Sequence, residues 1–168
     1  MIYLAHGASG NATSMQPYVD GLLRRGMSAT TVQLPRGAAE RALDPYRAQV
    51  TDYAGAVIGG HSFGGRVASM LASLEPPRGL VLLSYPLHRP GRPDEQRTGH
   101  WPHIACPVLL LSGESDPFAR VDLLRAAVET LPSAELITYS GVGHGLLSVI
   151  EGALDQVAAF VDGLPPSS

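Results

Sequence analysis

The sequence predicts an α/β fold in which about six parallel strands are flanked by helices. Short apolar runs alternate along the chain with segments whose apolar residues recur every three or four positions. Glycine-rich turns follow several of the apolar runs. This alternation is typical of strand–helix–strand units, and it disfavours an all-α or an all-β fold.

Six apolar runs are expected to form the strands. They cover residues 1–5, 29–34, 55–60, 79–84, 107–112 and 134–139. Apolar residues at helical spacing mark the helices between and after these runs. In chain order they are Met15, Val19 and Leu22; Tyr46, Val50 and Tyr53; Val67, Met70, Leu71 and Leu74; Val121, Leu124, Val128 and Leu131; and Ile150, Leu154, Val157 and Val161. We interpret these stripes as core surfaces.

Local signals mark the ends of two helices. Gly26 suits the left-handed conformation that often closes a helix. Asp44 is placed to cap the next helix, and Pro45 fits its first turn.

The segment Gly60-His61-Ser62-Phe63-Gly64 lies between an apolar run and a helical pattern. A turn from strand to helix at this point is so tight that only small flanking residues fit, and it exposes the serine hydroxyl at a helix N-terminus. There the unpaired N–H groups stabilise negative charge. Ser62 is therefore the candidate nucleophile of the chain.

A serine becomes a good nucleophile when a base removes its proton and an acid orients that base. Asp116 follows the run at 107–112, and His144 lies in a glycine-rich loop after the run at 134–139. Parallel strands bring these positions to one edge of the sheet. Glu114 is the alternative candidate for the acid. The alternative interpretation of His144 is a structural residue of its loop. We prefer Asp116.

An oxyanion formed at Ser62 needs two backbone donors. The N–H of Phe63 is the first, and the loop His6-Gly7-Ala8-Ser9-Gly10 after the first strand offers the N–H of Ala8 or, less favoured, of Ser9. We interpret His6 as a scaffold residue that fixes this loop.

These segments resemble the α/β-hydrolase superfamily along the whole chain. Within it, the chain is similar to the small predicted-hydrolase group related to a testis-expressed protein and to a subunit of the NSL chromatin complex. Further motifs that carry the likeness are Tyr85-Pro86-Leu87-His88 and Gly113-Glu114-Ser115-Asp116-Pro117-Phe118. The resemblance implies a minimal α/β-hydrolase fold with a Ser62–His144–Asp116 triad. Some relatives are interaction modules.

The chain departs from the usual superfamily pattern at two places. It lacks the two strands that usually precede the oxyanion strand, so the strand around Thr30, Thr31 and Val32 becomes an edge, and a homodimer through that edge is a hypothesis. The connection over residues 86–106 is too short for a cap domain, so an open site is expected.

That connection holds several residues whose side chains are able to bind an anion or a metal or to react. Arg89, Arg92 and Arg97 either bind an anionic substrate group or, as exposed arginines usually do, face solvent. His100 and His103 have no accompanying ligand cluster, so no metal is expected. Cys106 is interpreted as a buried apolar residue. The glycine-rich loops lack the Gly-Lys-Ser/Thr of a phosphate loop, which disfavours nucleotide binding.

Composition bounds the remaining possibilities. The chain has 168 residues, of which 45% are hydrophobic and 16% charged, with a formal net charge of −3. We expect one domain over residues 1–164 and a flexible tail over 165–168. No basic face favours nucleic acid, and no apolar run approaches the roughly 18 residues of a membrane helix, so a cytoplasmic protein is expected.

The resemblance and the residues together predict a serine hydrolase of the carboxylesterase or thioesterase type. It would use a covalent acyl-enzyme on a small-molecule acyl substrate and need no cofactor. The alternative is a non-catalytic interaction module with the same fold. The sequence does not distinguish hydrolysis from acyl transfer, and it does not identify the substrate.

Overall fold

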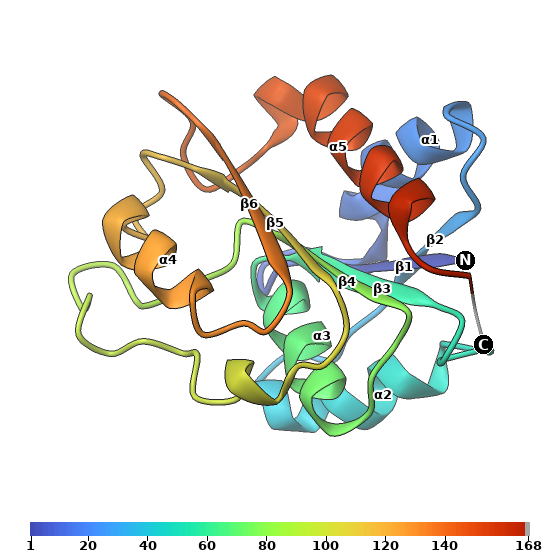
Figure 1. The fold of residues 1–168 in the computed structure, drawn as a ribbon, viewed down its shortest axis with the longest axis horizontal. Helices are drawn as coiled ribbons and strands as arrows, with labels where there is room; N and C mark the ends of the chain where they lie inside the picture. The colour runs from blue at the N-terminus through green and yellow to red at the C-terminus, as the bar shows by residue number, and fades with distance from the viewer. Residues whose placement is uncertain (167–168) are drawn as a thin grey trace.

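The computed structural model describes residues 1–166, and its centre is one sheet of six parallel strands (Figure 1). The strands are β1 (Ile2–Ala5), β2 (Ala29–Val32), β3 (Val57–His61), β4 (Gly79–Leu83), β5 (Val108–Gly113) and β6 (Ala134–Tyr139). Their order across the sheet is β2-β1-β3-β4-β5-β6. The predicted α/β class with six parallel strands is confirmed, and no cap domain is inserted within residues 1–166.

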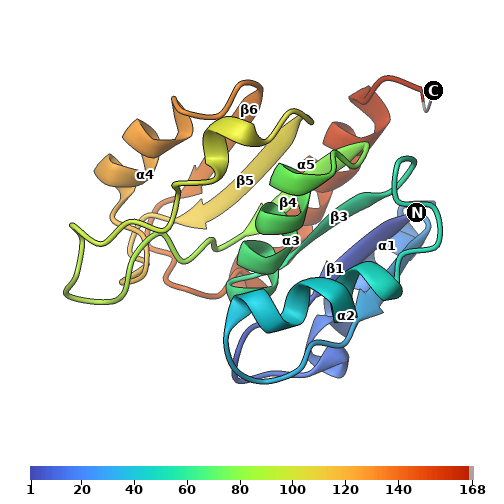
Figure 2. The same ribbon diagram turned by 90° about the horizontal axis from the view of Figure 1, so that it is seen from below.

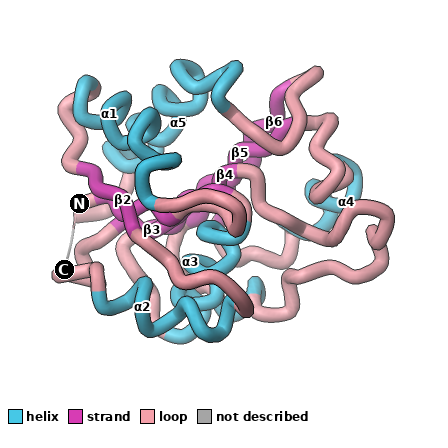
Figure 3. The backbone as a smooth tube through the Cα atoms, turned by 180° about the vertical axis from the view of Figure 1, so that it is seen from behind, coloured by secondary structure: helices cyan, strands magenta, loops and turns pink. Residues whose placement is uncertain are grey.

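Helices cover both faces of the sheet. The principal helices are α1 (Gln16–Arg24), α2 (Leu43–Ala48), α3 (Phe63–Leu74), α4 (Val121–Val128) and α5 (Ile150–Gly163). Helices α1 and α5 lie on one face, and Figure 2 shows α2 and α3 in front of the other. Figure 3, seen from behind, shows the same layers.

Two apolar clusters hold these layers together, one on each side of the sheet. Successive strand residues point to opposite faces. In β1, for example, Ile2 and Leu4 pack with Leu154 of α5, whereas Tyr3 and Ala5 belong to the cluster that contains Val67 of α3. Both faces of the central strands are therefore dry, which explains their nearly continuous apolar sequences.

Most predicted elements agree with the structure, but several details are wrong. Two predicted helical stripes run past the helices, because α2 ends at Ala48, before Val50 and Tyr53, and α4 ends at Val128, before Leu131. These three residues are nevertheless buried, as predicted.

Asp44 makes no capping hydrogen bond, because a short 3₁₀ helix, Ala39–Ala42, leads directly into α2 and places Asp44 inside the first turn. Leu74 is 75% exposed, because α3 ends there and its last residue extends past the core. Gly26 has the expected left-handed conformation, with φ of 76°.

Three further predictions concern the edge strand, membrane helices and the C-terminal tail. Strand β2 lies at the edge, as predicted. Within residues 1–166, no helix is both long enough and apolar enough to cross a membrane. Of the predicted tail, Pro165 accepts a hydrogen bond from Arg78 through its carbonyl oxygen (2.9 Å), while Ser167 and Ser168 lie outside the described residues.

Candidate active site

Ser62 occupies the tight turn between β3 and α3. Its backbone has φ of 51° and ψ of −115°, a conformation that side-chain-bearing residues seldom adopt. Side chains at Gly60 or Gly64 would collide with the carbonyl oxygen of Ala5 in the neighbouring strand. The two glycines thus let the chain turn sharply beside β1, and the hydroxyl of Ser62 faces a cavity at the helix N-terminus.

The structure brings Ser62, His144 and Asp116 into one hydrogen-bonded chain. His144 Nε2 lies 2.8 Å from Ser62 Oγ, and His144 Nδ1 lies 2.8 Å from Asp116 Oδ2. Because the carboxylate accepts the Nδ1–H proton, Nε2 is left to accept the proton of Ser62. The other carboxylate oxygen of Asp116, Oδ1, accepts the N–H of Phe118 at 2.8 Å. The acid is buried and fixed at both oxygens.

Glu114, the rival acid, points elsewhere. Its Oε1 accepts a hydrogen bond from Thr138 Oγ1 at 2.8 Å and lies 3.5 Å from Arg125 Nη2. The carboxylate that reaches His144 is therefore that of Asp116.

The loops that carry the acid and the imidazole are packed directly on each other. Gly113 lies so close to the carbonyl groups of Val142 and Gly143 that a side chain there would collide with them. The N–H of Ser115 donates to the carbonyl of Val142 at 2.9 Å. The spacing between Asp116 and His144 is thus set by backbone contacts as well as by their own hydrogen bond.

Two further side chains hold His144, and neither contact was predicted from the sequence. The ring of Phe118 stacks on the imidazole with the ring centroids 4.3 Å apart. His61 donates from Nε2 to the carbonyl oxygen of His144 at 2.9 Å. Burial lowers the pKa of His61, which favours its neutral form. His61 lies inside the Ser62 motif, but nothing in the sequence reveals its partner 83 positions away.

The predicted backbone donors, Ala8 and Phe63, line the same cavity as Ser62. Phe63 is the first residue of α3, so its N–H has no partner within the helix. His6 fixes the loop that carries Ala8. Its Nε2 accepts the N–H of Leu34 at 2.9 Å and its Nδ1 donates to the carbonyl of Gly7 at 2.7 Å. These contacts agree with the interpretation of His6 as a scaffold residue.

The cavity has a volume of about 670 Å³. Ser62 and His144 belong to its lining, and Phe63, Pro86 and Phe118 supply apolar surface. Its lining includes two basic residues, Arg66 and Arg97, and no aspartate or glutamate.

The remaining residues singled out in the sequence lie apart from Ser62. His100 Nε2 donates to Ser69 Oγ at 2.7 Å, and burial, helped by the charge of Arg66, lowers its pKa to about 4. His103 is exposed. Among residues 1–166, no three His, Cys, Asp or Glu side chains are grouped as a metal site requires. Cys106 is buried as predicted, and desolvation raises its pKa to about 12.

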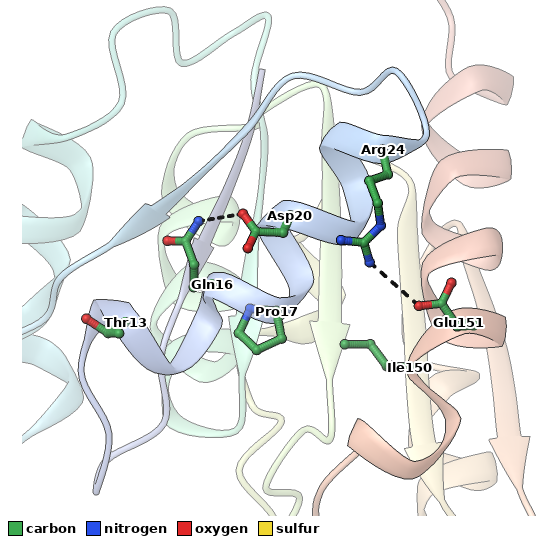
Figure 4. Close-up of a pocket in the computed structure, with 7 residues that line it drawn as sticks. All are labelled: Thr13, Gln16, Pro17, Asp20, Arg24, Ile150 and Glu151. Carbon is green, nitrogen blue, oxygen red and sulfur yellow. Dashed lines mark hydrogen bonds and ion pairs between the residues drawn. The ribbon is translucent and has the colours of Figure 1, made fainter.

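A second hollow lies between α1 and α5 (Figure 4). Its volume is about 570 Å³. Gln16 donates to Asp20 at 2.8 Å, and Arg24 pairs with Glu151 at 3.8 Å. The lining also includes Thr13, Pro17 and Ile150, and it holds no histidine or cysteine. We refer to this hollow as the α1–α5 cleft.

A family model described as "Alpha/beta hydrolase domain" matches residues 25–151. Among solved structures, the chain is similar to a monoacylglycerol lipase of Paleococcus ferrophilus, with a TM-score of 0.80, 15% identity, and 95% of this chain and 93% of that chain covered.

Two other similar structures belong to further organisms. A predicted CIB-like hydrolase of Thermoplasma acidophilum has a TM-score of 0.79 at 19% identity, covering 95% of this chain and 84% of its own. A pyrethroid hydrolase of Sphingobium faniae has a TM-score of 0.72 at 18% identity, covering 96% of this chain and 97% of its own. At these identities the likeness establishes the fold.

Proposed function

Because the chain belongs to the alpha/beta hydrolase family, we propose that it is a serine hydrolase of the carboxylesterase or thioesterase type that acts on small acyl compounds. The observation that carries the proposal is the hydrogen-bonded chain from Ser62 through His144 to Asp116. The similarity to lipases and other hydrolases supports the same reaction class.

In the proposed reaction, Ser62 Oγ attacks the carbonyl carbon of the substrate while its proton passes to His144 Nε2. Asp116 stabilises the imidazolium that forms. The carbonyl oxygen becomes an oxyanion that the N–H groups of Phe63 and Ala8 bind. His144 then gives its proton to the leaving alcohol or thiol, and the acyl group stays on Ser62.

In the second half of the cycle, His144 takes a proton from water as the water oxygen attacks the acyl-enzyme. Collapse of the second oxyanion breaks the bond to Ser62 Oγ, which recovers the proton from His144. If an alcohol or amine takes the place of water, the same steps give acyl transfer. None of these steps needs a cofactor.

Four finer assignments accompany this proposal. Within the family, the motifs at 6–10, 60–69, 85–88 and 113–118 favour the small predicted-hydrolase group that is related to the testis-expressed protein and the NSL complex subunit. A domain over residues 1–164 and a cytoplasmic location stay predictions. So does a homodimer through the edge strand β2; a monomeric mass by light scattering would contradict it.

Covalent labelling by a fluorophosphonate probe, read by intact mass, tests the proposed function. We expect native protein to gain one adduct on Ser62, and Ser62→Ala and His144→Ala to gain none, because phosphonylation requires an activated serine. Thr13→Ala, a change in the α1–α5 cleft, is the matched control and should label like native protein. Well-folded native protein that resists labelling would instead indicate the interaction module.

A further inference from the structure

The cavity beside Ser62 carries positive charge without a compensating acid. Two arginines, Arg66 and Arg97, line it together with Ser62 and His144. Neither arginine forms an ion pair with any residue in 1–166, although the chain as a whole has a net charge of −3. Other arginines do form ion pairs, as Arg92 does with Glu95 and Arg120 with Asp122.

Arg66 is placed by helix α3. Its N–H donates to the carbonyl of Ser62 at 3.0 Å, so the two residues are one helical turn apart on the same side of the helix. Side chains on a helix lean toward its N-terminus, which directs Arg66 toward Ser62. Its Nε atom is buried and finds no acceptor among the described residues. A buried donor of this kind is costly unless it binds something.

Arg97 is placed by the connection over residues 86–106. Its N–H donates to the carbonyl of Leu87 at 2.8 Å, and its carbonyl accepts the hydroxyl of Tyr85 at 2.6 Å. The backbone is thus tied down on both sides, while the side chain lines the cavity. Burial first, and then the charges of Arg66 and Arg89, lower the pKa of Arg97. The nearby Glu95 bonds to Arg92 instead.

We propose that Arg66 and Arg97 form a subsite for an anionic group, a carboxylate or a phosphate, at the end of the ester substrate distant from the reacting carbonyl. This inference rests on the proposed function. A guanidinium presents a planar set of donors that matches both anions, and two guanidiniums that line one cavity without an ion-pair partner are stabilised when an anion binds between them. The apolar surfaces of Phe63, Pro86 and Phe118 suit the body of the substrate between its ester and its charge.

Two pairs of rigid esters test the subsite. On the acyl side, the mono-4-nitrophenyl ester of terephthalic acid is compared with 4-nitrophenyl 4-carbamoylbenzoate. On the alcohol side, 4-carboxyphenyl acetate is compared with 4-carbamoylphenyl acetate. Within each pair only the charge differs, and the para geometry keeps the carboxylate away from its own ester. We expect kcat/KM to favour the anionic ester by about tenfold or more in one pair, mainly through KM.

The variants Arg66→Gln and Arg97→Gln should each reduce this anionic preference toward one, and Arg97→Glu should reverse it. Arg92→Gln is the control, because Arg92 belongs to the same connection but pairs with Glu95 outside the cavity. It should keep the native preference. Circular dichroism checks that each variant is folded, and Arg97→Gln alone suffices if Arg66→Gln is unstable.

The outcomes separate this inference from the proposed function. Native protein that hydrolyses both members of each pair equally well overturns the subsite and leaves the hydrolase in place, as does a preference that survives both arginine changes. If no ester is cleaved and Ser62 resists labelling, the hydrolase fails, and calorimetric titration of terephthalate and inorganic phosphate decides the subsite. Binding lost in Arg97→Gln but kept in Arg92→Gln supports it and identifies the preferred anion; no binding at millimolar concentration refutes it.

Discussion

The two hollows of this protein are similar in size and opposite in chemistry. In the α1–α5 cleft, of about 570 Å³, the charged side chains of the lining have partners within it: Arg24 pairs with Glu151, and Asp20 accepts a hydrogen bond from Gln16. In the cavity at Ser62, of about 670 Å³, two arginines have no acid. Polar groups that already bond to each other gain little from a ligand. Unpaired polar groups beside a serine and a histidine gain hydrogen bonds when a ligand binds. Unmet hydrogen-bonding capacity, more than volume, distinguishes the candidate site.

The largest expected effect concerns Asp116, the buried acid that bonds to His144 of the cavity lining. Asp116→Asn should lower kcat/KM for a reactive ester by roughly 10³- to 10⁴-fold, because an amide cannot stabilise the imidazolium and can favour the wrong tautomer of His144. The matched change Glu114→Gln removes a neighbouring carboxylate that does not contact His144, and it should alter kcat/KM by less than about twofold. Equal losses in the two variants would show that the acid has been misassigned.

A smaller effect concerns the contribution of His100, which bonds to Ser69 of α3, to the stability of the fold. The pKa of His100 is lowered from 6.5 to about 4, so below about pH 6.5 the unfolded chain binds a proton that the folded protein refuses. The contribution of His100 to the free energy of unfolding should therefore be fully present above pH 6.5, and the free energy should decrease as the pH falls toward 4. With allowance for the partial exposure of the ring, His100 contributes on the order of 1 kcal/mol to this decrease.

Urea unfolding of native protein and His100→Gln at pH 7.0, 5.5 and 4.5 measures this contribution. The variant should lose less stability between pH 7.0 and 4.5 than the native protein. It keeps the part that comes from His61, whose pKa is lowered by burial and which acts with the same sign. Parallel pH profiles for the two proteins would contradict the assignment to His100.

The smallest effect is expected in the α1–α5 cleft. Arg24→Gln removes a long ion pair whose two side chains are 64% and 69% exposed. Exposed pairs of this kind contribute little, so the melting temperature should change by about 1 °C or less and kcat/KM by less than about twofold. A large loss of activity would mean that this cleft is coupled to the cavity and that the two hollows do not differ in function.

The parts of the molecule that were predictable from sequence are those that local patterns specify. Six apolar runs mark the strands, and parallel strands bring their carboxyl ends to one edge, so Ser62, Asp116 and His144 could be placed together before the geometry was known. The preference for Asp116 over Glu114 agrees with the contacts observed.

The features that were missed depend on contacts between distant segments. The capping role expected of Asp44 failed because Ala39 and Ala42, both buried, draw the preceding residues into a 3₁₀ helix. The connection over residues 86–106 has no periodicity, so nothing in its sequence indicates that Arg97 lines the same cavity as Arg66 while Arg92 pairs with Glu95. Such pairings follow only from the course of the chain in space.

The backbone at Ser62 carries a consequence for the protein as a whole. A residue with a side chain at φ of 51° and ψ of −115° lowers the free energy of unfolding by on the order of 1 to 3 kcal/mol through backbone strain. Glycine at this position would avoid that strain. The fold would thus be firmer without the residue proposed to react. Stability and activity are in opposition at this single position, and selection for robustness alone would remove the serine.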